Sequence, residues 1–208
     1  MDNVTPQVVR DEHDAEPGET PAGDAHGVGQ EVRDLRKVKG MTIPQLAEVS
    51  GLSTGFISQM ERGLSSPSVD ALRKIAKALD VSISWFFRND EAVDKTERNY
   101  VVRSQQRRAL KYEAGIRDEL LSPHLRGQLE LLHCRFPPGS SSGEETYSHK
   151  GEEAGVVLQG QFELQIGDRT FLLNAGDSFG FPSTTPHRYR NPGTSETIVI
   201  WAVTPPSY

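Results

Sequence analysis

The sequence predicts a multidomain protein, with an all-α domain over residues 28–88 and an all-β sandwich or small barrel over residues 124–208. The first segment carries apolar residues at helical spacing, interrupted by glycines and helix-capping residues. The second consists of short alternating or apolar runs separated by Gly, Pro and Asn. The two segments also differ in charge, because residues 27–88 sum to +3 in a chain whose formal net charge is −6.

An acidic segment precedes the all-α domain. Residues 1–26 carry one Arg against seven acidic residues and almost no large apolar side chains. Such a segment cannot bury enough surface to offset its ordering entropy, so we expect residues 1–27 to be disordered, with a partner-binding arm as the alternative. No apolar run approaches the roughly 18 to 20 residues of a membrane span, and no secretory signal is evident. We therefore expect a cytoplasmic protein without membrane contact.

Five short helices are expected in the all-α domain. The first runs from Val28 to a stop at Gly40, and the second follows the N-cap Thr42. The third follows the N-cap Ser53 and ends at Gly63. The fourth and fifth are expected over residues 65–80 and 82–87, with Val69, Leu72, Ile75, Ala76 and Leu79 on the buried face of the fourth.

The second and third helices are joined by a tight turn at "SGLS", which is typical of a helix-turn-helix. A helical bundle that binds no nucleic acid is the alternative. Two features favour DNA: the positive charge of this segment, as phosphate binding requires, and short polar residues on the outer side of the third helix. These outward residues are Thr54, Gly55, Ser58 and Gln59.

The stretch "LRKVKGMTIPQLAEVSGLSTGFISQMERGLSSPSVDALRKIAKALDVS" resembles the lambda-repressor-like DNA-binding domain of the XRE family. The resemblance implies that the third helix enters the major groove, where the Gln59 amide is able to pair with adenine. It also implies an ion pair between Arg36 and Glu61. Thr42 and Ser53 are better explained as helix caps than as base readers. The implied DNA-binding residues are Thr42, Ile43 (through its backbone amide), Ser53, Thr54, Gly55, Ser58, Gln59 and Arg62, with Thr42, Ile43 and Arg62 on phosphates.

A mixed, charged segment over residues 89–123 is expected to connect the two domains, with strands at 99–104 and 109–114 leading into the barrel. Further strands are expected within 129–136, 153–167, 169–181 and 196–205. The lone Cys134 lies in the first of these and excludes an intramolecular disulfide; we interpret it as a small apolar residue of the strand.

Two motifs in the second domain resemble those of the cupin family. The first lacks the family's leading glycine and has Tyr147 in place of the first histidine. The second fits every spacing, although Thr184 stands where the family usually has a glycine. The resemblance implies a double-stranded β-helix, the jelly-roll barrel of cupins. The aligned positions are Tyr147, His149, Glu153 and Gly160 in the first motif, and Gly176, Pro182, His187 and Asn191 in the second.

A complete cupin holds a divalent metal ion with three histidines and a glutamate. Tyr147 replaces one histidine here, and a phenol that loses its proton near pH 10 is a poor ligand. His149, Glu153 and His187 remain as metal-ligand candidates, so a divalent metal cofactor stays open, and we rank it below an organic ligand.

Strand parity suggests that ligand. If residues 145–149 are extended, Glu145, Tyr147 and His149 share one face. Carboxylates and aromatic rings in a barrel mouth suit a small cation, although surface placement is the default for any single glutamate. The expected effector-binding residues are Glu145, Tyr147, His149, Glu153, Phe181, His187 and Trp201.

The order of the two domains resembles that of bacterial repressors of putrescine utilisation, which are XRE-family regulators with a cupin sensor. The resemblance implies a non-enzymatic transcriptional repressor that binds double-stranded DNA as a homodimer or higher homo-oligomer. It also implies an effector that is a polyamine or a related amine. The alternatives are a metal-dependent cupin enzyme, an oxygenase or isomerase, fused to a DNA-binding domain, and a helical scaffold that binds protein through the acidic tail.

Overall fold

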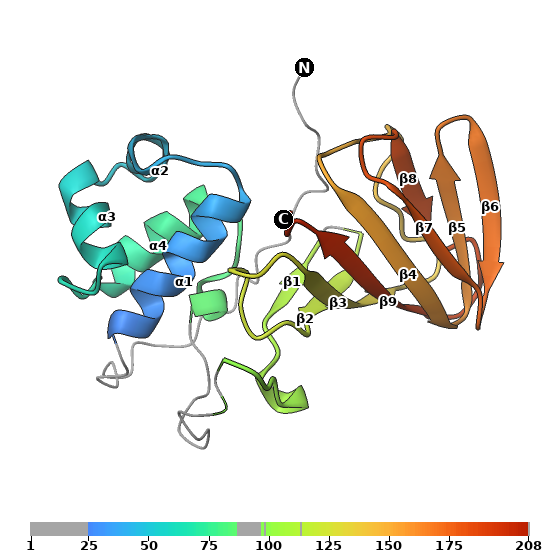
Figure 1. The fold of residues 1–208 in the computed structure, drawn as a ribbon, viewed down its shortest axis with the longest axis horizontal. Helices are drawn as coiled ribbons and strands as arrows, with labels where there is room; N and C mark the ends of the chain where they lie inside the picture. Colours follow the sequence, from blue (N-terminus) through green and yellow to red (C-terminus); the bar gives the residue numbers. More distant parts are fainter. Residues whose placement is uncertain (1–24, 87–96, 98, 113, 208) are drawn as a thin grey trace. The chain divides into compact units, whose positions relative to one another are not determined.

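A computed structural model describes residues 25–86, 97, 99–112 and 114–207, which form two compact units (Figure 1). One is built from helices and the other from strands; we call them the helical unit and the barrel unit. Residues 1–24 of the expected disordered tail lie outside the described residues. Residues 25–27 do not belong to a tail, because the first helix already begins at Ala25.

The helical unit contains the five expected helices, the last of them a 3-10 helix. Three N-cap side chains set the starts of the middle helices, because Thr42, Ser53 and Ser68 each accept a hydrogen bond from a backbone N–H of the first turn. The helices are α1 (Ala25–Val38), α2 (Ile43–Ser50), α3 (Thr54–Glu61), α4 (Val69–Ala78) and η1 (Ile83–Phe86).

The helices pack closely around an apolar core. At Gly29 of α1 an added Cβ would lie 2.0 Å from the carbonyl oxygen of Met60, so only glycine allows α1 and α3 to approach this closely. The expectation for Val69 is wrong, since this side chain is 44% exposed. It is the first residue of α4, and the apolar face of that helix is buried only from Ala71 onward. Fully buried core side chains include Val32, Leu35, Leu46, Ile57, Met60, Ile75 and Leu79.

The barrel unit consists of two antiparallel sheets. The larger has the strand order β1-β2-β3-β9-β4-β7 and the smaller the order β6-β5-β8. The strands are β1 (Ala109–Lys111), β2 (Arg117–Leu120), β3 (Glu130–Phe136), β4 (Glu152–Gln159), β5 (Gln161–Ile166), β6 (Arg169–Asn174), β7 (Ser178–Pro182), β8 (His187–Arg190) and β9 (Thr197–Thr204).

One expected strand of the connecting segment does not form. The backbone N–H groups of Tyr100 and Val101 both donate to the carbonyl of Glu97, so the chain turns there, and a 3-10 helix, η3 (Ser104–Gln106), follows. The strand expected at 109–114 is present as the shorter β1. The connecting segment thus supplies β1 and β2 to the larger sheet.

Aromatic rings from the two sheets meet inside the barrel unit. Phe162 of β5 lies 5.1 Å from Phe136 of β3 and 5.5 Å from Trp201 of β9, measured between ring centroids. Tyr189 of β8 lies 5.1 Å from Trp201. Cys134 is buried in the same interior, where burial raises the pKa of its thiol well above the ordinary value, so it is a protonated core residue. Among the described helices, none has the length and apolar character of a membrane span.

Candidate functional site

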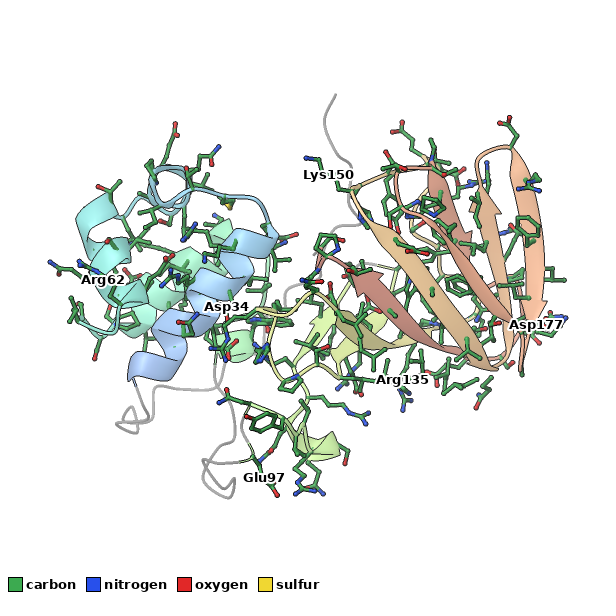
Figure 2. All side chains as sticks on the ribbon, viewed as in Figure 1. Asp34, Arg62, Glu97, Arg135, Lys150 and Asp177 are labelled. Carbon is green, nitrogen blue, oxygen red and sulfur yellow. The ribbon has the colours of Figure 1, made fainter. Side chains whose placement is uncertain are left out.

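The outer side of α3 is polar and sterically open. Thr54, Gly55 and Gln59 are exposed and Ser58 is half-buried, as the sequence predicts. The position of a Cβ on Gly55 has no neighbouring atom within 4 Å, so bare backbone faces outward there. Arg62 follows directly after α3, and Figure 2 shows its side chain at the outer edge of the helical unit. These residues form an exposed surface where another molecule is able to contact the helix backbone directly.

Two predicted DNA-binding side chains also serve the helix ends. Thr42 and Gln45 form a reciprocal capping box, with Oε1 of Gln45 accepting from the backbone N–H of Thr42 at 2.8 Å. Ser53 Oγ accepts from the N–H of Phe56 at 3.2 Å. The structural role of Thr42 and Ser53 is therefore that of helix N-caps. Ile43 begins α2 directly after its cap, where the first backbone N–H groups of a helix attract phosphate oxygens.

A buried ion pair holds α1 to α3. Arg36 Nε and Nη2 donate to the two carboxylate oxygens of Glu61 at 2.6 and 2.8 Å, and Nη1 donates to the carbonyl of Met41 at 2.7 Å. The expected pair of Arg36 and Glu61 is confirmed. This bidentate arrangement occupies both oxygens of the Glu61 carboxylate and fixes the orientation of α3.

Three side chains of the barrel unit converge on one point. Glu153 lies on β4, His187 begins β8, and His149 lies in the loop before β4. His149 Nε2 is 2.8 Å and His187 Nε2 is 3.2 Å from Glu153 Oε1. One nitrogen or oxygen atom of each residue lies within 4.8 Å of the other two. We call this group the His149–Glu153–His187 cluster.

Backbone pairing brings the loop of His149 to this point. Tyr147 and His187 exchange two backbone hydrogen bonds of 3.0 and 2.9 Å, and the N–H of His149 donates to the carbonyl of Ser183. Tyr147 and His149 consequently share a face, as the alternation predicts. The ring centroid of Tyr147 lies 4.3 Å from that of His187.

Backbone carbonyls orient both imidazoles. Nδ1 of His149 lies 3.1 Å from the carbonyl oxygen of Lys150, and Nδ1 of His187 lies 2.8 Å from that of Thr185. Because a carbonyl oxygen only accepts, each Nδ1 carries a proton and each Nε2 is turned toward Glu153. Both Nε2 atoms thus lie within hydrogen-bonding distance of the buried Glu153 Oε1. A proton on either Nε2 makes that nitrogen a donor to the carboxylate.

The carboxylate and the imidazoles of the cluster stabilise each other's charged forms. Burial raises the pKa of the Glu153 carboxyl, but hydrogen bonds from His149 and His187 and their charge outweigh burial and lower this pKa to about 2. The adjacent carboxylate in turn raises the pKa of His149, against the effect of burial. Glu153 is therefore ionised at neutral pH. Two imidazoles and a carboxylate also form a donor set that fits a divalent metal ion. Burial raises the pKa of Tyr147 well above its ordinary value, which leaves the phenol outside that set.

Not every predicted effector-binding residue joins the cluster. The expectation that Glu145 faces inward is wrong, because residues 144–145 form a bend and Glu145 is exposed. Phe181 is buried, with its ring centroid 4.8 Å from that of His187. Trp201 is buried too, and its indole N–H donates to Glu153 Oε2 at 2.9 Å. Other aromatic rings pack against the indole of Trp201. Its contact with the cluster is therefore the hydrogen bond from the indole N–H.

Sequence reasoning missed two buried carboxyl groups of the same interior, Asp118 on β2 and Glu130 on β3. A signal was present, since Asp118 alternates with Ile116 and Leu120, which are buried. Glu130 likewise begins the inward-facing series of β3. From the sequence alone, an acidic residue beside a short apolar run is interpreted as the end of a strand.

Two family models match the chain, Helix-turn-helix over residues 32–86 and Cupin domain over residues 132–203. The regulator PuuR of Escherichia coli is 29% identical over 181 residues, which cover 86% of this chain and 96% of PuuR. SutR, an HTH-type transcriptional regulator of the same species, is 31% identical over 164 residues, which cover 78% of this chain and 85% of SutR. The chain belongs to the HTH-type transcriptional regulators.

This HTH-type regulator is thus a DNA-binding protein of the XRE type with a cupin domain. It is also similar to two solved structures. One is an HTH_3 family transcriptional regulator from Vibrio cholerae, with 24% identity and a TM-score of 0.41 over 87% of this chain and 96% of the other. The second is the hydroxypropylphosphonic acid epoxidase from S. wedmorenis, with 22% identity and a TM-score of 0.45 over 87% of this chain and 98% of the epoxidase.

Proposed function

We propose that the cupin domain of this regulator senses a small cationic amine, whose ammonium group binds at the His149–Glu153–His187 cluster and changes how the helical unit binds its operator. The observation that carries this proposal is the buried, ionised carboxylate of Glu153, with two imidazole Nε2 atoms 2.8 and 3.2 Å from its Oε1. An ammonium group carries a positive charge and only N–H donors, so it complements a buried carboxylate. The rings of Tyr147 and Phe181 beside His187 add cation-π attraction.

A divalent metal ion is the second candidate for the same position. It is favoured by the ligand atoms of the cluster, which lie within 4.8 Å of one another, and by the backbone contacts that turn both Nε2 atoms inward. His149, Glu153 and His187 would hold the ion, which would supply a fixed positive charge and sites open to a further ligand. The relatives named as transcriptional regulators support a sensing role over an enzymatic one.

Ligand binding to the full chain separates these candidates. After treatment with a chelator, the protein is titrated by calorimetry with butylamine, diaminobutane and divalent metal ions, and its melting temperature is followed in parallel. A ligand that binds only the folded state raises the melting temperature by mass action. We expect an amine to bind and to raise it without added metal.

Glu153→Gln is the test variant, and Glu152→Gln, its exposed neighbour, is the matched control. Removing the charged partner of an ammonium should weaken amine binding about tenfold or more in Glu153→Gln, with little change in Glu152→Gln. Equal amine affinity in wild type and Glu153→Gln would refute the proposed position. Stoichiometric metal binding without any amine binding would favour the second candidate.

We also propose that the regulator acts as a repressor and binds as a dimer to two half-sites about one helical turn apart. Gln59 is proposed to contact a base, while Ile43 and Arg62 contact phosphates. The exposed, sterically open side of α3 supports this assignment. An operator selected from random DNA should lose its preference for one base pair when Gln59→Ala is used. Unchanged base preference at every operator position would contradict a base contact by Gln59.

A further inference from the structure

One edge of the smaller sheet of the barrel unit is open. β6 stands at the end of the strand order β6-β5-β8, and among the described residues it pairs only with β5. Figure 1 shows β6 at the outer margin of the barrel unit, with no labelled strand beyond it. The opposite edge of this sheet is covered, because Ser141 and Tyr147 form backbone bridges with β8. β6 is therefore the free edge of the smaller sheet.

Two residues of β6 direct their backbone groups toward this open side. The N–H of Asn174 donates to Asp177 Oδ2 at 2.8 Å, and its carbonyl accepts from the N–H of Asp177 at 2.9 Å, so both groups point away from β5. Because the direction of these groups alternates along an antiparallel strand, those of Thr170 and Leu172 point the same way. Within the described chain, neither residue has a backbone partner on that side. Their N–H and C=O groups are thus available to another strand.

β6 also lacks the features by which sheet edges usually avoid pairing. Such edges are short, or they carry proline, several charges or a bulge. The edge strands of the larger sheet follow this rule, since β1 has three residues and β7 ends in Pro182. β6 has six residues, of which only Arg169 is charged, and its register with β5 runs without a break. Two of its large apolar side chains are exposed, Phe171 by 38% and Leu172 by 53%.

The sequence of β6 is complementary to a second copy of itself. A two-fold axis makes two identical strands antiparallel and places one residue opposite its own counterpart. If that residue is Phe171, Thr170 of each copy lies opposite Leu172 of the other, and each such pair exchanges both of its backbone hydrogen bonds. All the available groups are then used. Arg169 lies opposite Leu173 of the other copy, so no like charges oppose each other.

The side chain of Phe171 fits this register. Phe171 lies opposite the buried Leu164 of β5, so its ring is on the inner side of the sheet although a single chain leaves it partly exposed. In the self-paired edge, the two Phe171 residues form a pair without hydrogen bonds between them, the kind that brings side chains closest. Each ring would then cover the other, and an aromatic pair across two strands is stabilising.

We propose that β6 is the surface through which two copies of this regulator associate, by antiparallel pairing centred on Phe171 that joins the two three-stranded sheets into one. The inference rests on the proposed binding of a dimer to two half-sites and names the surface that forms the dimer. Each copy contributes one β6, so the association closes at two copies.

Analytical ultracentrifugation of the full chain over a range of concentrations tests the surface. Leu172→Pro removes an N–H that points away from β5, so the single chain keeps its own ladder while the pairing loses a donor from each copy. We expect the dissociation constant of the dimer to rise at least about tenfold. Leu172→Lys, which leaves the backbone donor in place and adds a charge to the edge, should weaken the dimer as well.

Leu158→Lys is the matched control for these variants. Leu158 lies on β4 and is 52% exposed, nearly the same as Leu172, but it does not belong to the edge. The dimer should keep its wild-type dissociation constant in this variant. Circular dichroism of each variant checks that the single chain is folded.

Cysteine cross-linking tests the register. Cys134 is buried, so a cysteine introduced on β6 supplies an exposed thiol in a chain that otherwise has none. Directly opposed residues of a pair without hydrogen bonds have the spacing that a disulfide requires. With oxidised glutathione, Phe171→Cys should form a disulfide-linked dimer several-fold faster than Leu172→Cys, because only residue 171 faces its own counterpart.

The outcomes separate this inference from the proposed function. A wild-type dimer that persists unchanged in both Leu172→Pro and Leu172→Lys would overturn the β6 surface and leave dimeric DNA binding standing. Faster cross-linking of Leu172→Cys than of Phe171→Cys would overturn the pairing centred on Phe171. A wild-type chain that stays monomeric, both alone and on DNA with two half-sites, would overturn the proposed dimeric binding itself.

Discussion

Glu61 in the helical unit and Asp118 in the barrel unit are both buried carboxyl groups, and they differ in how their charge is balanced. Arg36 donates to both oxygens of Glu61. Asp118 receives hydrogen bonds from the uncharged Cys134 and Tyr112, and its Oδ1 has no partner within the described chain. The charge of Glu61 is thus balanced inside the helical unit, whereas among the described residues Asp118 has no cationic partner.

The largest expected effect comes from breaking the complete pair. Arg36→Leu leaves the Glu61 carboxylate buried without its partner, and removing one member of a buried pair costs about 3–5 kcal/mol of the free energy of unfolding. Urea unfolding followed by circular dichroism at a helical wavelength measures the change. Lys74→Leu is the control, because its ion pair with Asp70 is exposed and contributes about 0.5 kcal/mol or less. Similar losses of the free energy of unfolding in both variants would show that the buried ion pair contributes no more than the exposed one.

Replacing Asp118 is expected to raise the free energy of unfolding instead of lowering it. In the folded state this carboxyl keeps its proton up to about pH 6, whereas its ordinary pKa is 3.8. The folded state thus binds more protons between these values, and its stability falls as the pH rises through that interval. Asp118→Asn does not titrate, so it should be more stable than wild type near neutral pH by up to about 3 kcal/mol.

The advantage of Asp118→Asn should shrink as the pH falls from about 6 and vanish below 3.8, where the wild-type carboxyl is protonated in both states. Thermal melts of both proteins without ligand, across this pH range, measure the difference. Asp118→Asn being less stable than wild type at neutral pH would mean that the charge of Asp118 is balanced inside the fold. The proposed difference between the balanced Glu61 and the unbalanced Asp118 would then be wrong.

The smallest effect on stability is expected on the surface of the helical unit. The Arg62 side chain is exposed and donates to the carbonyl of Ser58 at 3.1 Å, so Arg62→Ala should change the free energy of unfolding by less than about 0.5 kcal/mol. The affinity of Arg62→Ala for operator DNA and for unrelated DNA should fall by a similar factor. The slope of log affinity against log salt concentration should be reduced by about one. Fluorescence anisotropy at several salt concentrations measures this, with Arg73→Ala on α4 as the control.

Local patterns allowed the helical unit to be predicted closely. Thr42, Ser53 and the glycine stops act within one helical turn, so the sequence marks these helix boundaries directly. Val69 is the exception, because the apolar pattern does not show where a helix begins to be covered by its neighbours. The strand expected at 99–104 failed for a similar reason, since local hydrogen bonds to Glu97 turn the chain there.

The candidate site in the barrel unit was predicted less completely. Tyr147, His149, Glu153 and His187 follow from motif spacing, and they do meet in the fold. Glu145 failed because strand parity holds only where the backbone is extended, and the chain bends before Tyr147. Asp118 was missed because an acidic residue is expected on the surface, and only the paired strands show that it faces inward.

The sequence by itself determined the two kinds of domain, the polar outer side of α3 and the spacing of the cupin motifs, because caps, periodicity and turns are encoded over a few residues. Only the tertiary structure decided which buried charges are balanced. Strand register is a long-range property, and it brings Asp118 and Glu153 onto one inner surface of the barrel unit. The packing of α1 against α3 is long-range as well, and it gives Glu61 a bidentate ion pair with Arg36.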